Sequence, residues 1–176
     1  MKKILTLFVA LFATGSLFAT VDTVCVGGLR YSYDSSTSSA AVIDTVPAYK
    51  GAVVIPDSIK VGSLGYEVTG IMDSAFYNCT GLESLTLPAG ITKIKNSAFY
   101  NCTGLKTITF KGTVPSTIGT NPFDNVKPDI VNVPINDLGS YQLSFASYPD
   151  IASKLVGYVT TAQELENFIA AAAGHD

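Results

Sequence analysis

The chain has 176 residues, enough for one domain, with 14 acidic against 11 basic residues and a formal net charge of −3. This balance argues against binding to a phosphate backbone, so we expect no nucleic-acid partner. The single histidine, His175, lies one residue from the C-terminus, where chains usually fray. Without a built histidine site or a Gly-rich phosphate loop, we expect no enzyme activity, no catalytic residue, no cofactor and no metal.

Residues 1–19 have the features of an export signal. Lys2 and Lys3 precede an apolar run over 4–13, and Ser16-Leu17-Phe18-Ala19 offers a small-residue cleavage site. The run is shorter than the roughly 20 residues of a membrane-spanning helix. We therefore expect an exported chain that begins at Thr20 and has no membrane span after cleavage. An uncleaved signal anchor is the alternative.

The sequence pattern of residues 20–48 predicts β-hairpins. Leu29, Tyr31 and Tyr33 alternate with polar residues, a serine-rich turn follows at 35–39, and 41–46 makes the return strand. A stack of strands leaves open edges that pair with other chains. We expect this segment to be an N-terminal cap over the repeats that follow, rather than a separate interaction module.

Residues 49–148 form a repeat array. The segment SAFYNCTGL occurs at 74–82 and again at 97–105, a period of 23 residues. Each copy continues into an L-x-x-L-x-L run, and its last residues alternate as in a half-buried strand. The residues of these runs are Leu82, Leu85 and Leu87, then Leu105, Ile108 and Phe110. A fixed period of this length predicts a solenoid, in which each coil buries its apolar side against its neighbours.

Weaker copies flank these two. A corner at 121–126 aligns Phe123 with the earlier phenylalanines, and a further strand is expected at 131–133. Upstream, Val53 aligns with Leu85, but the spacing exceeds the period by nine residues, which predicts an inserted turn at 61–65. We expect about four stacked strands, near the minimum of roughly three for a repeat array.

Three ladders of side chains follow from the period. Cys79 and Cys102 share one position, which Val126 takes in the third copy. Cα atoms on neighbouring strands lie about 4.8 Å apart, which is within the Cα–Cα distance range of a disulfide. Side chains that lie parallel in a ladder, however, lack the crossed geometry that this bond prefers. We favour two buried thiols over a bridge or a metal site; Cys25 has no evident partner.

The other two ladders are polar or aromatic. One consists of Asn78, Asn101 and Asn125, whose amides can form hydrogen bonds along the stack. The other consists of Tyr77 and Tyr100, which face either a partner or the cap.

The C-terminal segment, 149–176, changes character. Thr161 and Glu164 form a capping box that begins a helix at about 162–173. Its apolar face consists of Leu165, Phe168, Ile169 and Ala172. We expect this face to dock on the domain; the alternative is a partner or another copy. Upstream, Asp137 is expected to cap a short helix that carries Tyr141 and Phe145.

The motif AFYNCTGL, followed by SLTLP and ITKI, resembles the BspA-type leucine-rich repeat over residues 49–148. The resemblance implies a β-rich, right-handed solenoid of leucine-rich-repeat type, on a secreted or surface-attached bacterial protein. It also implies adhesion to host or matrix proteins. The family fixes no binding residue by motif, so none is carried over.

These observations favour a secreted or cell-surface interaction module with a protein partner. The outward residues between the apolar positions are the candidate partner-binding face, together with the tyrosine ladder. They are Glu83, Ser84, Thr86, Lys106, Thr107, Thr109, Tyr77 and Tyr100. The alternative is a structural or assembly subunit of the cell envelope without a specific ligand, for which an oligomer is expected.

Overall fold

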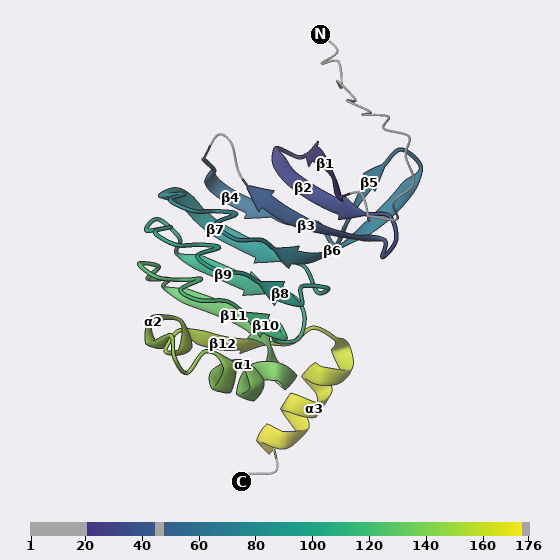
Figure 1. Ribbon diagram of the computed structural model, residues 1–176. Helices are drawn as coiled ribbons and strands as arrows, with labels where there is room; N and C mark the ends of the chain where they lie inside the picture. Colours follow the sequence, from purple (N-terminus) through teal and green to yellow (C-terminus); the bar gives the residue numbers. More distant parts are fainter. Residues whose placement is uncertain (1–20, 45–47, 174–176) are drawn as a thin grey trace, which may run out of the picture.

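The computed structural model describes residues 21–44 and 48–173 (Figure 1). The expected export signal and His175 lie outside these residues. The described chain is rich in strands and has few helices. Its strands form two sheets, one of five strands and one of seven, whose buried faces enclose a common core.

The five-stranded sheet is a parallel stack built mainly from the repeats. Its strands, in spatial order, are β4 (Lys50–Val54), β7 (Gly81–Leu87), β9 (Thr107–Phe110), β11 (Ile130–Pro134) and β12 (Leu155–Tyr158). Leu85 pairs with Ile108, which confirms that the two closest repeat copies lie on each other. Val53 pairs with Leu85, as the upstream alignment predicts. Strand β12 was not foreseen from the sequence.

The seven-stranded sheet lies on the other side of the core and contains the strands in which the chain runs back. Its strands are β1 (Val21–Val26), β2 (Leu29–Asp34), β3 (Ser39–Asp44), β5 (Ser58–Val61), β6 (Leu64–Ile71), β8 (Lys93–Ile94) and β10 (Thr117–Ile118). The first three are antiparallel, which confirms the predicted hairpins. Gly27 and Gly28 join β1 to β2 with φ of 60° and 85°, values that a two-residue hairpin turn demands. Strand β3 then pairs with β6 in parallel.

The longer spacing upstream of the repeats has a local cause. Strands β5 and β6 form an antiparallel hairpin, and its two-residue turn is Gly62 and Ser63. Gly62 has a φ of 63°, which glycine adopts without steric cost. This hairpin accounts for the extra residues between Val53 and Leu85, and it confirms the predicted inserted turn.

A ladder of phenylalanines runs through the core. The ring of Phe99 stacks between those of Phe76 and Phe123, with centroid distances of 5.2 and 5.3 Å. All three are buried. The ladder ends on helix α1 (Leu138–Ser144), where Phe145, the residue that follows the helix, meets Phe123 edge-on at 5.7 Å. The repeat period therefore places one aromatic ring per coil in a single continuous core.

The corner before each repeat strand is held by an asparagine ladder. Asn78, Asn101 and Asn125 have φ of 60°, 59° and 62°. Asparagine tolerates this left-handed conformation better than most residues. The Asn101 side-chain amide donates to Oδ1 of Asn78 at 2.6 Å, which confirms the expected bond along the stack. Asn101 thus supports both its own turn and the neighbouring corner at Asn78.

The two roles of Asn101 can be separated by mutation. We expect Asn101→Ala to destabilise the protein by about 1–2 kcal/mol, because it loses the amide bond and places alanine at a positive φ. Asn101→Gly loses the same bond but relieves the backbone, so it should cost less. Urea denaturation of both variants measures the difference. Equal losses of stability in the two variants would mean that the backbone conformation at Asn101 contributes nothing to the free energy of unfolding.

The C-terminal segment contains a 3₁₀ turn (Ile135–Asp137), α1, α2 (Pro149–Ala152) and α3 (Ala162–Ala173). The expected cap by Asp137 is wrong, since its side chain makes no capping hydrogen bond. The capping box is confirmed. The N–H of Glu164 donates to Oγ1 of Thr161 at 3.2 Å, and the N–H of Thr161 donates to Oε2 of Glu164 at 3.1 Å. The hydroxyl of Thr160 also donates to this carboxylate and lowers the pKa of Glu164 below its usual value.

Helix α3 does not dock as the sequence led us to expect. Leu165 is 48% exposed and Ile169 is 56% exposed. Tyr141 and Phe145, both fully buried, already close this end of the core. None of the described helices is long and apolar enough to cross a membrane.

Candidate interaction surface

The outward residues of β7 and β9 lie side by side. Ser84 pairs with Thr107 and Thr86 with Thr109, while Leu85 and Ile108 between them are buried. One residue earlier on each strand, the N–H of Lys106 donates to the carbonyl of Glu83 at 2.8 Å. The structure therefore brings six of the eight candidate residues together, five on the neighbouring strands β7 and β9 and Lys106 directly before β9.

The surface continues onto strands that the candidate set omitted. Ile130 pairs with Thr107, and Asn132 pairs with Thr109. The side-chain amide of Asn132 donates to Oγ1 of Thr109 at 3.2 Å. The strand expected at 131–133 already implied the outward position of Asn132 but did not include Ile130. Extending the repeat alignment by one copy would have found both residues.

We call the outward residues of this sheet the strand face, and they form two rows across the stack. One row is Val54, Thr86, Thr109, Asn132 and Val156, and the other is Ala52, Ser84, Thr107 and Ile130. Neither row contains a charged residue. Exposed charges border the rows at Glu83, Lys106 and Asp129, whose signs alternate from strand to strand. The strand face is thus an uncharged surface with a charged rim.

Tyr77 and Tyr100 lie on the corner turns that precede β7 and β9. Their rings stack with a centroid distance of 5.2 Å and an interplanar angle of 6°. Tyr77 is 53% exposed and Tyr100 is half-buried. The two rings contact each other and present an aromatic surface beside the sheet rather than within its rows.

The cysteine ladder is structural. Cys79 and Cys102 are buried thiols, and no disulfide joins any of the three cysteines, all of which the structure describes. The thiol of Cys102 donates to the carbonyl of Phe76 at 3.0 Å. A hydrogen bond with Cys79, together with burial, raises the pKa of Cys102. Both positions therefore act as small core residues, as predicted, while Cys25 is exposed.

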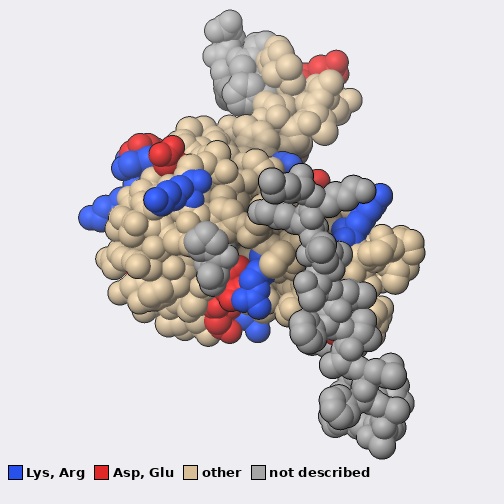
Figure 2. Space-filling model, turned by 90° about the horizontal axis from the view of Figure 1, so that it is seen from above, with Lys and Arg blue, Asp and Glu red and all other residues tan. Residues whose placement is uncertain are grey.

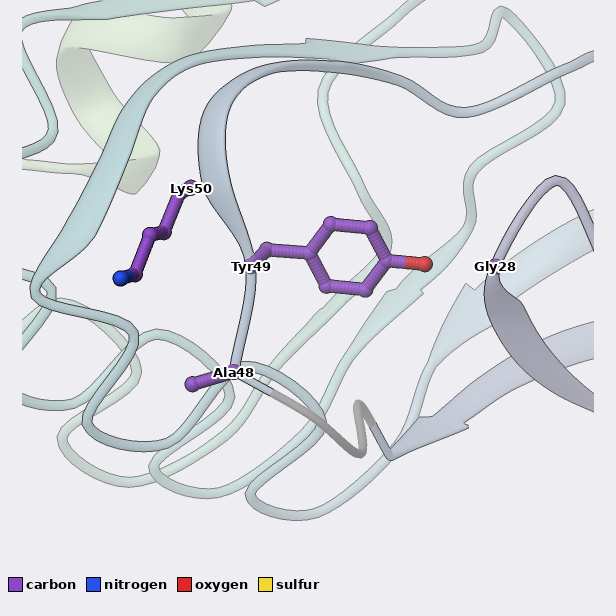
Figure 3. Close-up of a pocket in the computed structure, with 4 residues that line it drawn as sticks. All are labelled: Gly28, Ala48, Tyr49 and Lys50. Carbon is purple, nitrogen blue, oxygen red and sulfur yellow. The ribbon is translucent and has the colours of Figure 1, made fainter.

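The described surface has shallow hollows, two of which are defined by their lining residues. The larger, of about 470 Å³, is lined by Gly28, Ala48, Tyr49 and Lys50 (Figure 3). The second, of about 180 Å³, lies between the corner at Phe123 and helix α2. Within residues 21–44 and 48–173, no group of three or more histidine, cysteine or acidic side chains is placed to hold a metal. The geometry suits recognition by an extended surface better than chemistry in a pocket.

Comparison with known proteins gives the following matches. The profile of the BspA type leucine-rich repeat region, which spans six copies, matches residues 58–153. A leucine-rich cell surface protein from Faecalibacterium prausnitzii A2-165 is similar over 69% of this chain and 34% of its own, with 23% identity and a TM-score of 0.44. A leucine-rich repeat protein from Bacteroides ovatus is similar over 64% and 35%, with 16% identity and a TM-score of 0.42.

A third solved structure, from Bacteroides capillosus, is similar over 63% of this chain and 97% of its own, with 23% identity and a TM-score of 0.38. A search of curated proteins found no match. The chain spans about a third of the length of the first two structures. Because the repeat profile covers more than half of the chain and agrees with the motifs in the sequence, this protein belongs to the BspA-type leucine-rich repeat family.

Proposed function

We propose that this protein is a secreted or cell-surface interaction module, a right-handed solenoid that binds an extracellular host or matrix protein through its strand face. The observation that carries the proposal is the strict register of the two outward rows over β7, β9 and β11. Export rests on the charged and apolar pattern of residues 1–19. The family resemblance supports adhesion.

The strand face has the physical properties of a recognition surface. Its threonines are β-branched, and Thr86 and Thr109 are held half-buried by pairing neighbours. Ordering them on binding costs little entropy, which favours affinity. An uncharged centre with charges at Glu83 and Lys106 on the rim matches the usual division of a protein interface. The exposed ring of Tyr77 supplies an aromatic anchor beside it.

One observation favours the structural alternative. The side chains of the strand face are small, and Ser84, Thr107 and Asn132 offer few of the large anchors that dominate tight interfaces. A structural subunit of the envelope would use this face for lateral packing only. It would form assemblies that grow with concentration beyond two copies and would capture no host protein.

A matched pair of charge reversals tests the proposed binding. Lys106→Glu changes the rim of the strand face, while Lys93→Glu makes the same change at an exposed position of β8 on the other sheet. Capture of extracellular-matrix and serum proteins by the immobilised chain identifies the partner. We expect Lys106→Glu to slow association with it about five- to tenfold, because rim charges steer encounter. Lys93→Glu should leave association unchanged.

Both variants should keep their stability within about 0.5 kcal/mol, since each substitution is on the surface. If the wild type captures nothing above an unrelated secreted domain, adhesion is wrong. If both lysines matter equally, binding is driven by overall charge and the strand face is not the site.

A further inference from the structure

The corner turns that precede β7, β9 and β11 lie one above another on one side of the stack (Figure 1). Each of the first two donates three backbone N–H groups, from alternate residues, to carbonyls of the next corner at 2.7 to 2.9 Å. The donors and their acceptors are Ser74 with Asn96, Phe76 with Ala98, Asn78 with Tyr100, Ser97 with Thr120, Phe99 with Pro122 and Asn101 with Asp124. Backbone hydrogen bonds therefore join the corners as they join the strands.

The third corner has the same row of donors but no corner after it. By alignment these donors are Asn121, Phe123 and Asn125. Asn121 and Asn125 have φ of 53° and 62°, close to 51° at Ser97 and 59° at Asn101, so the backbone follows the same path. Among the described residues, none accepts a hydrogen bond from these three N–H groups. The two asparagines are exposed, so a partner can reach this open row.

The chain replaces the side chains of a fourth corner but not its backbone. The rings of Phe145 and Tyr148 meet Phe123 edge-on at 5.7 and 6.3 Å and continue the aromatic ladder. The backbone of this segment bonds to itself instead, as in the hydrogen bond from the N–H of Tyr148 to the carbonyl of Phe145 at 2.8 Å. The core is thus closed at this end, while the row of N–H groups stays open.

The hollow of about 180 Å³ lies beside the open row, and we call it the corner groove. It is lined by Phe123, Asp124 and Asn125 on one side and by residues 147–151 on the other. Two of the three open donors, those of Phe123 and Asn125, therefore border it. Among its lining residues, the charged ones are Asp124 and Asp150, and both are acidic.

The charge of the corner groove has one sign. At the opposite end of the stack, seen from above in Figure 2, basic and acidic side chains lie next to one another in several places. In the groove, a free anion would suit the N–H donors, but the carboxylates of Asp124 and Asp150 would repel it. A free cation would suit the carboxylates but would leave the donors without an acceptor. The occupant must therefore supply carbonyl acceptors and positive charge together.

We propose that the corner groove binds a basic peptide segment of another protein, which lies along the third corner as a fourth corner would. Its alternate carbonyls accept from the open row, and its arginine or lysine pairs with Asp124 or Asp150. Such a segment has about five residues, because the acceptors within this protein come from alternate residues over 96–100 and 120–124. The corner groove is separate from the strand face, so this inference does not rest on the proposed adhesion.

The position of the basic residue follows from the repeat. Asp124 occupies the position that Tyr77 and Tyr100 take in the earlier corners, where neighbouring side chains stack on each other. A basic side chain at the same position of the bound segment would therefore lie next to Asp124. An acidic side chain there would be repelled, which gives the groove a preference that the backbone row alone does not have.

Nuclear magnetic resonance of the protein, purified after expression of the full chain, observes the open donors directly. The probe is a capped peptide of sequence Ala-Ala-Arg-Ala-Ala, and its matched control has Glu in place of Arg. We expect the Arg peptide to bind with a Kd on the order of 1 mM and to move the amide protons of Phe123 and Asn125 downfield, because they gain an acceptor. The amide protons of Phe99 and Asn101, which already donate, should shift little.

A matched pair of double variants tests the charges. Asp124→Asn with Asp150→Asn should weaken binding of the Arg peptide about tenfold, since two partly exposed ion pairs are lost. Asp57→Asn with Glu67→Gln makes the same change of net charge at exposed positions around the other sheet and should leave binding unchanged. Melting temperatures confirm that both double variants fold. Lys106→Glu should also leave peptide binding unchanged, so this proposal and the proposed adhesion fail separately.

Three results would overturn the proposal. The first is no shift of the Phe123 and Asn125 amide protons at about 10 mM Arg peptide, roughly tenfold above the expected Kd. The second is equal binding of the Glu peptide, or equal weakening by both double variants. The third is slow hydrogen exchange of these two amides in the protein alone, which would mean that a second copy or another part of the chain already fills the groove.

Discussion

Phe99→Ala is expected to lower the free energy of unfolding by about 3–5 kcal/mol, the usual range for a buried phenylalanine. Phe99 is fully buried and lies at the middle of the ladder, with Phe76 at 5.2 Å and Phe123 at 5.3 Å. Removing its ring leaves a cavity between two coils. Because each coil buries its apolar side only against its neighbours, the loss is transmitted along the stack.

Tyr77→Ala is the matched control for this change. Tyr77 is the residue after Phe76 in the repeat, and its ring also stacks on an aromatic neighbour, Tyr100. It is 53% exposed, so we expect a loss of about 1 kcal/mol or less. Urea denaturation followed by circular dichroism compares the two variants. If Phe99→Ala costs no more than Tyr77→Ala, the inner ladder does not hold the array together.

Gly104→Ala is expected to destabilise the protein by about 1–3 kcal/mol, the range for overpacking a tight site. A Cβ at this position would overlap the carbonyl oxygen of Thr80 and would lie 3.1 Å from that of Leu82. Both are backbone atoms of the preceding coil, so neither can move aside by a rotamer change. The close approach of successive coils therefore requires glycine here.

Gly81 provides the comparison, because it takes the same position one period earlier. A Cβ at Gly81 would meet Cγ of Lys50 at 2.9 Å, and this side chain is flexible and exposed. We expect Gly81→Ala to cost well under 1 kcal/mol. Thermal unfolding of the two variants distinguishes a steric limit set by backbone from one set by a side chain. Equal melting temperatures would contradict this explanation.

The repeat period made much of the core predictable. Once SAFYNCTGL recurs after 23 residues, Leu85 must stack on Ile108 and Phe76 on Phe99, because equal positions in successive coils share one column. The same reasoning placed Cys79 and Cys102 as buried thiols. It also located the strand face, since side chains alternate along a strand.

Other features follow from contacts that no local pattern encodes. Strand β12 lacks the repeat motif, and it joins the sheet because β11 offers it an open edge. The apolar pattern of α3 predicted docking, but Leu165 is 48% exposed, because an amphipathic pattern does not by itself supply a surface for the helix to cover. The Asp137 cap failed because a 3₁₀ turn leads directly into α1. Each outcome depends on neighbouring segments rather than on the pattern of the element itself.

By itself, the sequence determined the family, the column that each repeat residue occupies and the face of the sheet on which it lies. A periodic chain repeats the same local choices, so its register is fixed wherever one face is buried. The tertiary structure alone decided how the stack ends. The ends lack a repeating neighbour, and their cover depends on which segments fit the remaining edges: α1 and α2 at one end, and the antiparallel strands β1 and β2 at the other.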